Sequence, residues 1–189
     1  GSIGVSTLDI IKKDKKNFDI FLLTANNNYK KLINQAKEFN VKNVLIGNSK
    51  FYNKVKKSLK NKKTKVYSGN VSLTRIIRKR LDCTMSAIVG LAGLQPTIDA
   101  IKISKTVAIA NKETIICGWS ILSRLKKKYK TELIPVDSEH FSIMNLTKDI
   151  TNDKVEEIII TASGGPFLNY SYNKMKNVKP KQAIAHPNW

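Results

Sequence analysis

The residues best suited to chemistry in this 189-residue chain are Asp137-Ser138-Glu139-His140. In extended chain the side chains of Asp137 and Glu139 point the same way, because residues two apart share one face of a strand. Two neighbouring carboxylates repel each other unless a cation lies between them, and oxygen ligands suit Mg²⁺ or Mn²⁺. Two carboxylates seldom suffice, so a third ligand is expected elsewhere. The alternative is structural, with Asp137 as the N-cap of a helix.

A second candidate is Asn111-Lys112-Glu113, which joins an apolar strand to a long helix. In a functional interpretation, Asn111 and Glu113 lie beside a nucleotide and Lys112 contacts a substrate. In a structural interpretation, Asn111 caps the helix and Glu113 stabilises its first turn, where the helix dipole favours a carboxylate. The spacing alone does not decide between these interpretations.

The glycines of Gly1-Ser2-Ile3-Gly4 have the spacing of the second half of a G-x-x-G-x-x-G turn, directly before a helix. Glycines there let the backbone approach a pyrophosphate, and the helix N-terminus favours the anion. The alternative is a terminal remnant without function. No basic leader or apolar stretch typical of a signal peptide is visible at this end.

Two further candidates lie toward the end of the sequence. Ser163, with the backbone amides of the two glycines that follow it, can bind an oxyanion or hydroxyl groups. His186 can bind a substrate or transfer a proton, and Trp189 can close over a ligand from a mobile loop. The alternatives are a glycine-rich turn and disordered terminal residues.

Strand and helix patterns alternate along the chain, and these elements must position the candidate residues. Several strands are apolar throughout, which indicates a parallel sheet covered on both faces, with ligands at the carboxyl ends of its strands. The expected strands are 18–25, 43–47, 64–67, 85–89, 106–110, 132–136 and 157–161. The expected helices are 6–16, 28–40, 49–60, 73–81, 96–104, 113–129 and 140–146, followed by short helical pieces after 170.

The composition raises a competing hypothesis, because 34 Lys and Arg against 14 Asp and Glu give a formal charge of +20. Such a charge is typical of nucleic-acid binding. The cations cluster at 54–65, 75–80 and 124–130, on the solvent face of amphipathic helices, and are absent from 81–101, 131–147 and 155–173. A solvated surface is therefore favoured over a polyanion site. No run of eighteen apolar residues predicts a membrane span. The two cysteines indicate buried thiols, not a disulfide framework.

Taken in order, the motifs resemble the 1-deoxy-D-xylulose 5-phosphate reductoisomerase family. The matching stretches are GSIGVSTLDII, SAIVGLAGLQPTIDAIK, TVAIANKETIICG, LIPVDSEHFSI, ITASGGPF and HPNW. Six ordered matches that span nearly the whole sequence are specific as a set.

The resemblance implies an NADPH-dependent oxidoreductase and isomerase that needs Mg²⁺ or Mn²⁺. Its reaction would convert 1-deoxy-D-xylulose 5-phosphate to 2-C-methyl-D-erythritol 4-phosphate in non-mevalonate isoprenoid biosynthesis. It implies an α/β fold with a Rossmann-like, doubly wound, mostly parallel sheet over 1–135, lacking its first strand. Residues 136–189 would begin an α+β catalytic and metal-binding domain. The chain would cover about the first half of such an enzyme, and we expect it to be inactive alone.

The resemblance also assigns roles to individual residues. The expected cofactor-binding residues are Gly1, Ser2, Ile3, Asn26, Asn27, Asn28, Asn111 and Glu113. The expected metal ligands are Asp137 and Glu139, and the expected catalytic residues are Lys112, Glu139 and His186. The expected substrate-binding residues are Lys112, Ser138, Glu139, Ser163, His186 and Trp189. The family usually has Gly-Lys-Asn at 26–28, so only Asn28 agrees. The absence of this Lys weakens the binding expected for the 2′-phosphate of NADPH.

The same resemblance implies a small-molecule sugar phosphate as substrate, no nucleic-acid or membrane partner, and a homodimer in the full-length enzyme. The location expected is the cytoplasm of a bacterium, or a plastid-type organelle in a eukaryote. Three alternatives stay open. They are a non-catalytic nucleotide-binding fragment, a basic nucleic-acid-binding domain, and a different α/β dehydrogenase acting on an aldehyde or semialdehyde.

Overall fold

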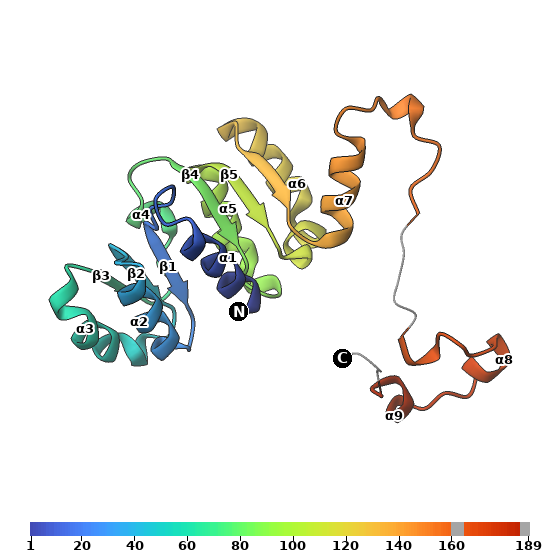
Figure 1. Cartoon of the computed structure of the whole chain (residues 1–189), viewed down its shortest axis with the longest axis horizontal. Helices are drawn as coiled ribbons and strands as arrows, with labels where there is room; N and C mark the ends of the chain where they lie inside the picture. The colour runs from blue at the N-terminus through green and yellow to red at the C-terminus, as the bar shows by residue number, and fades with distance from the viewer. Residues whose placement is uncertain (160–164, 186–189) are drawn as a thin grey trace. The chain divides into compact units, whose positions relative to one another are not determined.

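The computed structural model describes residues 1–159 and 165–185, and the chain divides into two compact units, 1–141 and 142–189. Figure 1 shows helices and strands alternating through the first unit. Its strands are β1 (Leu22–Ala25), β2 (Asn43–Ile46), β3 (Lys65–Ser68), β4 (Leu81–Ser86), β5 (Ser104–Ile109) and β6 (Glu132–Pro135). Its helices are α1 (Ser2–Lys13), α2 (Tyr29–Glu38), α3 (Tyr52–Leu59), α4 (Leu73–Ile76), α5 (Leu94–Ile103) and α6 (Lys112–Tyr129).

All strand pairs among the described residues are parallel, which confirms the predicted α/β fold class. Hydrogen bonds divide the strands into two three-stranded sheets, in the orders β1-β2-β3 and β4-β5-β6. Leu22 is in register with Asn43, which is in register with Lys65. Leu81 is in register with Ser104 in the other sheet. Since a parallel pair needs a crossover, each connection carries a helix.

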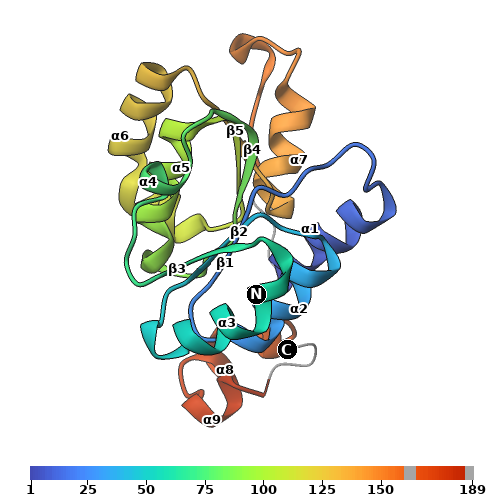
Figure 2. The ribbon, with the colours of Figure 1, turned by 90° about the vertical axis from the view of Figure 1, so that its left-hand side faces the viewer.

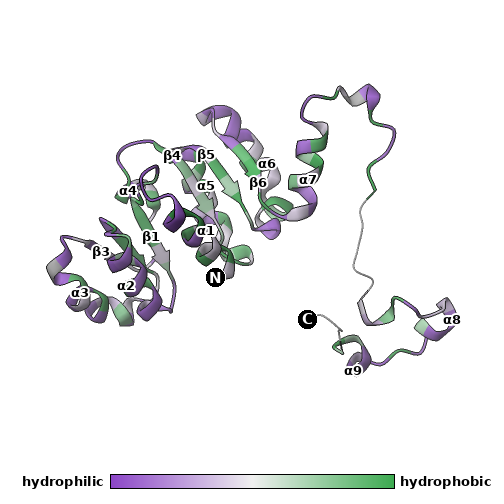
Figure 3. Cartoon of the chain, viewed as in Figure 1, coloured by the Kyte–Doolittle hydropathy of each residue, from purple (hydrophilic) through white to green (hydrophobic). Residues whose placement is uncertain are grey.

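The first sheet is covered on both faces, as in a doubly wound fold. Successive residues of a strand point to opposite faces. On β2, Val44 and Ile46 pack in one cluster with residues of α2 and α3, and Leu45 packs in another with Ile76 of α4. Figure 2 shows α2 and α3 together beside the first sheet. In Figure 3, β1 and β5 are largely hydrophobic, whereas α2 and α3 carry hydrophilic residues.

The second sheet is packed against α5 and α6. Val107 and Ile109 of β5 form a buried cluster with Ile101 of α5 and Leu122 of α6. These side chains are at most 2% exposed. The cluster fixes the start of α6 relative to the carboxyl end of β5, which is where the candidate residue Asn111 lies.

The side chains of Asp99 and Arg80 each join separate elements of this unit by hydrogen bonds. The carboxylate of Asp99 on α5 is 3% exposed and accepts hydrogen bonds from Ser72 Oγ at 2.6 Å and Leu73 N at 2.9 Å, at the start of α4. The guanidinium of Arg80 donates to the carbonyl oxygens of Ser104 at 3.2 Å and Tyr129 at 2.7 Å. Arg80 therefore ties the C-terminal end of α6 to the start of β5.

Several predicted elements differ from the structure in their bounds or in their presence. The strand expected at 85–89 lies at β4, four residues earlier, because Leu81–Ser86 pairs along β5 while 87–89 form a loop. The helix expected at 73–81 ends at Ile76, since Leu81 already belongs to the sheet. Residues 157–159 form no strand, as no described strand pairs with them, and 160–161 lie outside the described residues.

The second unit begins within helix α7 (Ser138–Thr147) and contains the short helices α8 (Tyr172–Met175) and α9 (Pro180–Ala183). These match the short helical pieces expected there. None of the side chains described in this unit is buried, so its described part has no core of its own. No helix within 1–159 or 165–185 is both long and apolar enough to cross a membrane.

Candidate cofactor and metal site

The candidate residues of the first unit follow the carboxyl ends of its strands. Asn26–Asn28 follow β1, Gly90 lies in the loop after β4, Asn111 lies after β5 and Asp137 lies after β6. Carboxyl ends of parallel strands lie along one edge of a sheet, where open α/β sheets bind ligands. The topology therefore places polar loops at the carboxyl edge of each sheet.

The turn after β1 is tied to the loop after β2. Asn48 Nδ2 donates to Asn27 Oδ1 at 2.9 Å, and the Asn48 amide donates to the carbonyl of Asn26 at 3.1 Å. Asn28 caps α2 by accepting from Lys31 N at 3.1 Å. A Cβ added to Gly47 would lie 2.7 Å from Asn26 Oδ1, so a larger residue there would displace the Asn26 side chain. The three exposed asparagines thus form one braced turn.

Asn48 is a member of this arrangement that the sequence interpretation missed. It follows strand β2 and a glycine, much as Asn111 follows strand β5. The usable signal was its place at a strand carboxyl end. Without the register of β1 against β2, its link to Asn27 could not be foreseen.

Asn111 is 3% exposed and caps α6, with its Oδ1 accepting from Thr114 N at 3.0 Å. Its amide nitrogen donates to the carbonyl oxygens of Ile88 and of Gly90, the latter at 2.7 Å. The structural interpretation of Asn111 as a helix cap is therefore confirmed. The neighbouring Lys112 is exposed and Glu113 is half-buried in the first turn of α6.

A buried polar pair underlies the loop after β4. Ser86 Oγ lies 2.6 Å from Thr97 Oγ1, which also donates to the carbonyl of Gly93 at 2.7 Å. A Cβ on Gly93 would contact the Asn111 amide and lie 2.6 Å from the carbonyl oxygen of Ile88. This pair and Gly93 were also missed, since nothing in the local sequence shows how closely the loop approaches α6.

The glycine turn at the start of the chain lies at the end of β4. Gly1 is the N-cap residue of α1, and a Cβ built on it would be 4.0 Å from the carbonyl oxygen of Ala87. Ser2 and Ile3 form the exposed first turn of α1. The helix starts at Ser2, four residues before the expected start, so its first turn begins next to the residue that follows β4.

Asp137 and Glu139 do not lie in extended chain, so the expected same-face pairing of their side chains is wrong. Asp137 precedes α7, and its Oδ1 accepts from the amide of His140 at 2.9 Å; Nδ1 of the His140 ring lies 2.6 Å from the same oxygen. Glu139 lies within the helix, where residues two apart do not face each other. Its Oε2 accepts from Ser138 Oγ at 3.0 Å.

The electrostatics of Asp137 follow from this capping role. Partial burial raises the pKa of the carboxyl group. The hydrogen bonds from the His140 amide and ring lower this pKa, and together they outweigh the effect of burial. The resulting pKa is below the ordinary value of 3.8. In the described part of the chain, no group of three or more His, Cys, Asp or Glu side chains could hold a metal ion. Two carboxylates alone therefore do not complete a metal site here.

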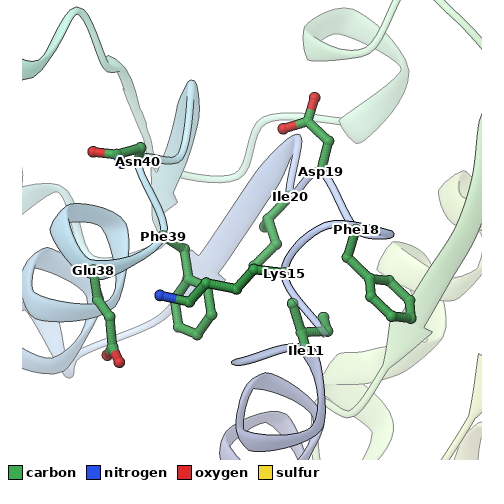
Figure 4. A pocket seen from close by; sticks show the side chains of 8 residues that line it. All are labelled: Ile11, Lys15, Phe18, Asp19, Ile20, Glu38, Phe39 and Asn40. Carbon is green, nitrogen blue, oxygen red and sulfur yellow. The ribbon is translucent and has the colours of Figure 1, made fainter. Parts of the chain in front are cut away.

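Ser163, His186 and Trp189 lie outside the described residues, so their predicted roles stay predictions. The hollow shown in Figure 4 contains none of the candidate residues. It has a volume of about 130 Å³ and is lined by residues that precede the amino ends of β1 and β2. Lys15 Nζ lies 5.1 Å from the centre of the Phe39 ring in this hollow. Its lining residues are Ile11, Lys15, Phe18, Asp19, Ile20, Glu38, Phe39 and Asn40.

Parallel strands, crossover helices on both faces of the first sheet and polar loops at the strand carboxyl ends define a Rossmann-like α/β protein. A family model described as 1-deoxy-D-xylulose 5-phosphate reductoisomerase matches residues 1–118, and a model of the C-terminal domain of that enzyme matches residues 133–189. The chain therefore belongs to the 1-deoxy-D-xylulose 5-phosphate reductoisomerase family, as the ordered motifs predicted.

Individual relatives agree with this membership. The reductoisomerase of Pelagibacter ubique is 53% identical over 191 residues, covering 100% of this chain and 49% of the relative. A structure of the Zymomonas mobilis enzyme in complex with NADPH is 40% identical, with a TM-score of 0.88 over 97% of this chain and 49% of that one. Another reductoisomerase structure, with NADPH, fosmidomycin and magnesium, is 32% identical, with a TM-score of 0.80. The match covers 100% of this chain and 49% of the chain in that structure. The chain spans about half the length of the curated relatives it matches.

Proposed function

We propose that this chain supplies the cofactor-binding half of an NADPH-dependent enzyme that converts 1-deoxy-D-xylulose 5-phosphate to 2-C-methyl-D-erythritol 4-phosphate. The observation that carries the proposal is the family match across both ends of the chain, 1–118 and 133–189. It is supported by the polar loops at the strand carboxyl ends and by solved relatives that hold NADPH and magnesium.

The residues of the first unit fit a dinucleotide. A Cβ built on Gly90 would meet no atom within 4 Å, so the turn after β4 faces open space that a ligand can approach. Gly1, Ser2 and Ile3 would offer the N-terminal amides of α1 to the pyrophosphate. The braced turn Asn26–Asn28 would lie toward the adenosine end, and Glu113 at the start of α6 would line the same edge. NADPH would supply the hydride that reduces the rearranged aldehyde.

The divalent cation does not have a complete site in the described residues, so we derive no step through it. Asp137 and Glu139 would be two of its ligands, and the remaining ligand would come from elsewhere in the enzyme. Lys112, Ser138, Ser163, His186 and Trp189 would contact the sugar phosphate. The exposed ammonium group of Lys112 would bind substrate oxygens as they gain negative charge.

The substrate is a small sugar phosphate, the full-length enzyme is a homodimer, and nucleic acid and membranes are not its partners. The domain boundary lies near residue 135, and the enzyme works in the bacterial cytoplasm or a plastid-type organelle. The lysine clusters then serve as solvated helix surface, not as a polyanion site.

The proposal is tested by titrating the 189-residue chain with NADPH in a calorimeter, and by following NADPH oxidation with substrate and Mn²⁺. We expect the chain to bind NADPH without oxidising it. The described residues form neither a complete metal site nor a binding site for the substrate phosphate. Turnover by the chain alone would contradict the expected inactivity. Failure to bind NADPH, together with salt-sensitive DNA binding that survives Asp137→Asn and Glu139→Gln, would favour the nucleic-acid-binding alternative.

A further inference from the structure

The three loops at the carboxyl edge of the first sheet contact one another. The turn after β1 is bonded to the loop after β2 through Asn48, whose Nδ2 donates to Asn27 Oδ1 at 2.9 Å. Oδ1 of the same Asn48 accepts from the backbone amide of Lys50 at 3.1 Å. A Cβ built on Gly69, which follows β3, would lie 3.3 Å from Ser49 Oγ. Two successive hydrogen bonds therefore hold the backbone of Lys50 close to the turn after β1.

The same edge carries cations and no carboxylate. Between residues 20 and 75 the sequence has a single acidic residue, Glu38, which ends α2 and pairs with Lys12 of α1. Because α2 runs back from the end of β1 to the start of β2, Glu38 lies at the opposite, amino edge of the sheet. A carboxylate at the end of β1 would repel a phosphate, whereas an edge with cations alone attracts one.

The ammonium group of Lys50 is available to such a phosphate. Its side chain is exposed, and none of the ion pairs in the described part of the chain includes it. Lys54, one helical turn further on, has its Nζ 5.4 Å from the centre of the Tyr29 ring, so that ring already holds its charge. The Tyr29 ring also stacks on Phe51 at 4.6 Å, which fixes the chain next to Lys50.

The topology places the ribose of a bound dinucleotide at the turn after β1. In Rossmann-like proteins the ribose 2′ position is read about 20 residues beyond the glycine turn. In this chain the glycine turn 1–4 leads through α1 to β1, and residues 26–28 follow directly. Asn27 occupies the position at which the family usually has Lys, so the turn itself supplies no cation for a 2′-phosphate.

We propose that Lys50 is a specificity-determining residue, which binds the 2′-phosphate of NADPH in place of the lysine that the family usually carries at position 27. The phosphate would accept a charge-assisted hydrogen bond from Lys50 Nζ. The chain would thereby keep a preference for NADPH over NADH, through a cation from the loop after β2. This inference rests on the proposed function, since it assumes that the dinucleotide binds along the carboxyl edge of the strands.

The test compares the affinities for NADPH and NADH of the unchanged 189-residue chain with those of three variants, measured by calorimetry. We expect Lys50→Met to weaken NADPH binding by about tenfold and to leave NADH binding unchanged, because only NADPH carries the 2′-phosphate. Lys37→Met is the matched control, since it removes the same charge from the last turn of α2 at the amino edge. It should change neither affinity. Lys30→Met tests a neighbouring exposed cation in the first turn of α2.

A rescue variant provides a second readout. Adding Asn27→Lys to Lys50→Met should restore NADPH affinity and leave NADH affinity unchanged, because both positions would serve the same phosphate. Salt screens such an exposed charge pair, so NADPH affinity should fall more steeply with added NaCl in the unchanged chain than in Lys50→Met. The melting temperature of Lys50→Met should equal that of the unchanged chain, which separates lost binding from lost folding.

Each possible result decides the inference or the function on which it rests. Equal affinity of the unchanged chain for NADPH and NADH would overturn the inference, as would unchanged NADPH affinity in Lys50→Met. A selective loss in Lys30→Met without one in Lys50→Met would also overturn it, by assigning the phosphate to α2. Failure of the unchanged chain to bind either dinucleotide would instead overturn the proposed function. A selective loss in Lys50→Met that Asn27→Lys restores supports the inference.

Discussion

At the scale of single residues, Asp99 shows how a buried carboxylate organises a loop. Its side chain receives hydrogen bonds from Ser72 Oγ, from the amide of Leu73 and from Gln95 Nε2 at 3.1 Å. Burying a carboxylate is unfavourable unless hydrogen bonds replace those lost to water. The three donors do so, and in return the carboxylate holds the start of α4 against α5.

Removing this carboxylate should therefore destabilise the first unit. We expect Asp99→Ala to lower the free energy of unfolding by about 2–3 kcal/mol, because hydrogen bonds to charged groups are the stronger ones and two half-buried donors, Ser72 Oγ and Leu73 N, lose their partner. Urea unfolding followed by circular dichroism measures the change. Asp82→Ala is the control, since Asp82 is exposed and only pairs with Lys105, and its effect should stay near zero. Equal effects would contradict this account of Asp99.

The glycines provide a second test at this scale, because they differ in the space around them. An added Cβ at Gly93 would lie 2.6 Å from the carbonyl oxygen of Ile88, whereas one at Gly4 in α1 would meet nothing within 4 Å. We expect Gly93→Ala to destabilise by about 1–3 kcal/mol through overpacking. Gly4→Ala should stabilise by about 0.5–1 kcal/mol, since alanine is the better helix residue. Thermal unfolding of both variants checks the opposite signs.

Residue types alone predicted the helix caps Asn111 and Asp137 only as alternatives to ligand binding, and they did not predict the cap at Asn28. The sequence could not show that the Asn111 amide faces two loop carbonyls, because that contact joins segments more than twenty residues apart. It also could not show that Asp137 and Glu139 diverge, since this depends on where α7 begins. Contacts of this kind come from packing, which one sequence does not display.

At the scale of elements, helix α1 is linked to α2 by the ion pair of Lys12 and Glu38, whose charged atoms are 2.6 Å apart. The hydrogen bond and charge of Glu38 raise the pKa of Lys12 above its ordinary 10.5. The hydrogen bond from Lys12 lowers the pKa of Glu38 below its ordinary 4.5. Both shifts mean that the charged forms are favoured in the folded chain.

The pH dependence of this pair follows from the signs of the shifts. Its contribution is present between pH 4.5 and 10.5, is lost as the pH falls through the lowered pKa of Glu38, and is lost as the pH rises through the raised pKa of Lys12. We expect Glu38→Gln to lower the melting temperature slightly at pH 7, and we expect this difference to shrink as the pH falls below 4.5. The pair is exposed, so 1 M salt should abolish the difference at pH 7. A difference in melting temperature that does not shrink at acid pH would contradict the ion-pair origin.

Local patterns predicted the order and type of most elements, and β4 shows where they fail. The apolar run Met85–Val89 looked like the strand, yet β4 begins at Leu81 and includes Asp82 and Thr84. Pairing with β5 decides the position, because the backbone bonds of Leu81–Ser86 are satisfied there. β4 is an edge strand of its sheet and contains polar residues. Its sequence is therefore less hydrophobic than the loop that follows it.

At the scale of the whole molecule, the charge of +20 is the dominant electrostatic feature. Self-repulsion among excess cations destabilises a compact chain, and added salt screens it. We expect the melting temperature to rise between 20 mM and 300 mM NaCl, by about 2–4 °C for each kcal/mol of repulsion removed. Thermal unfolding across this range, repeated with sodium fluoride as a second salt, provides the measurement. A fall in melting temperature would mean that the ion pairs outweigh the repulsion.

The division of the strands into two sheets has a consequence for behaviour in concentrated solution. Among the described strands, β1 bonds only to β2 and β4 only to β5, so each leaves one side of its backbone without a strand partner. Such sides act as templates that recruit strands from other molecules. Like charge keeps the molecules apart at low ionic strength, so the salt that stabilises each molecule also permits them to associate. The chain is therefore best stored dilute, at the lowest ionic strength at which it remains folded.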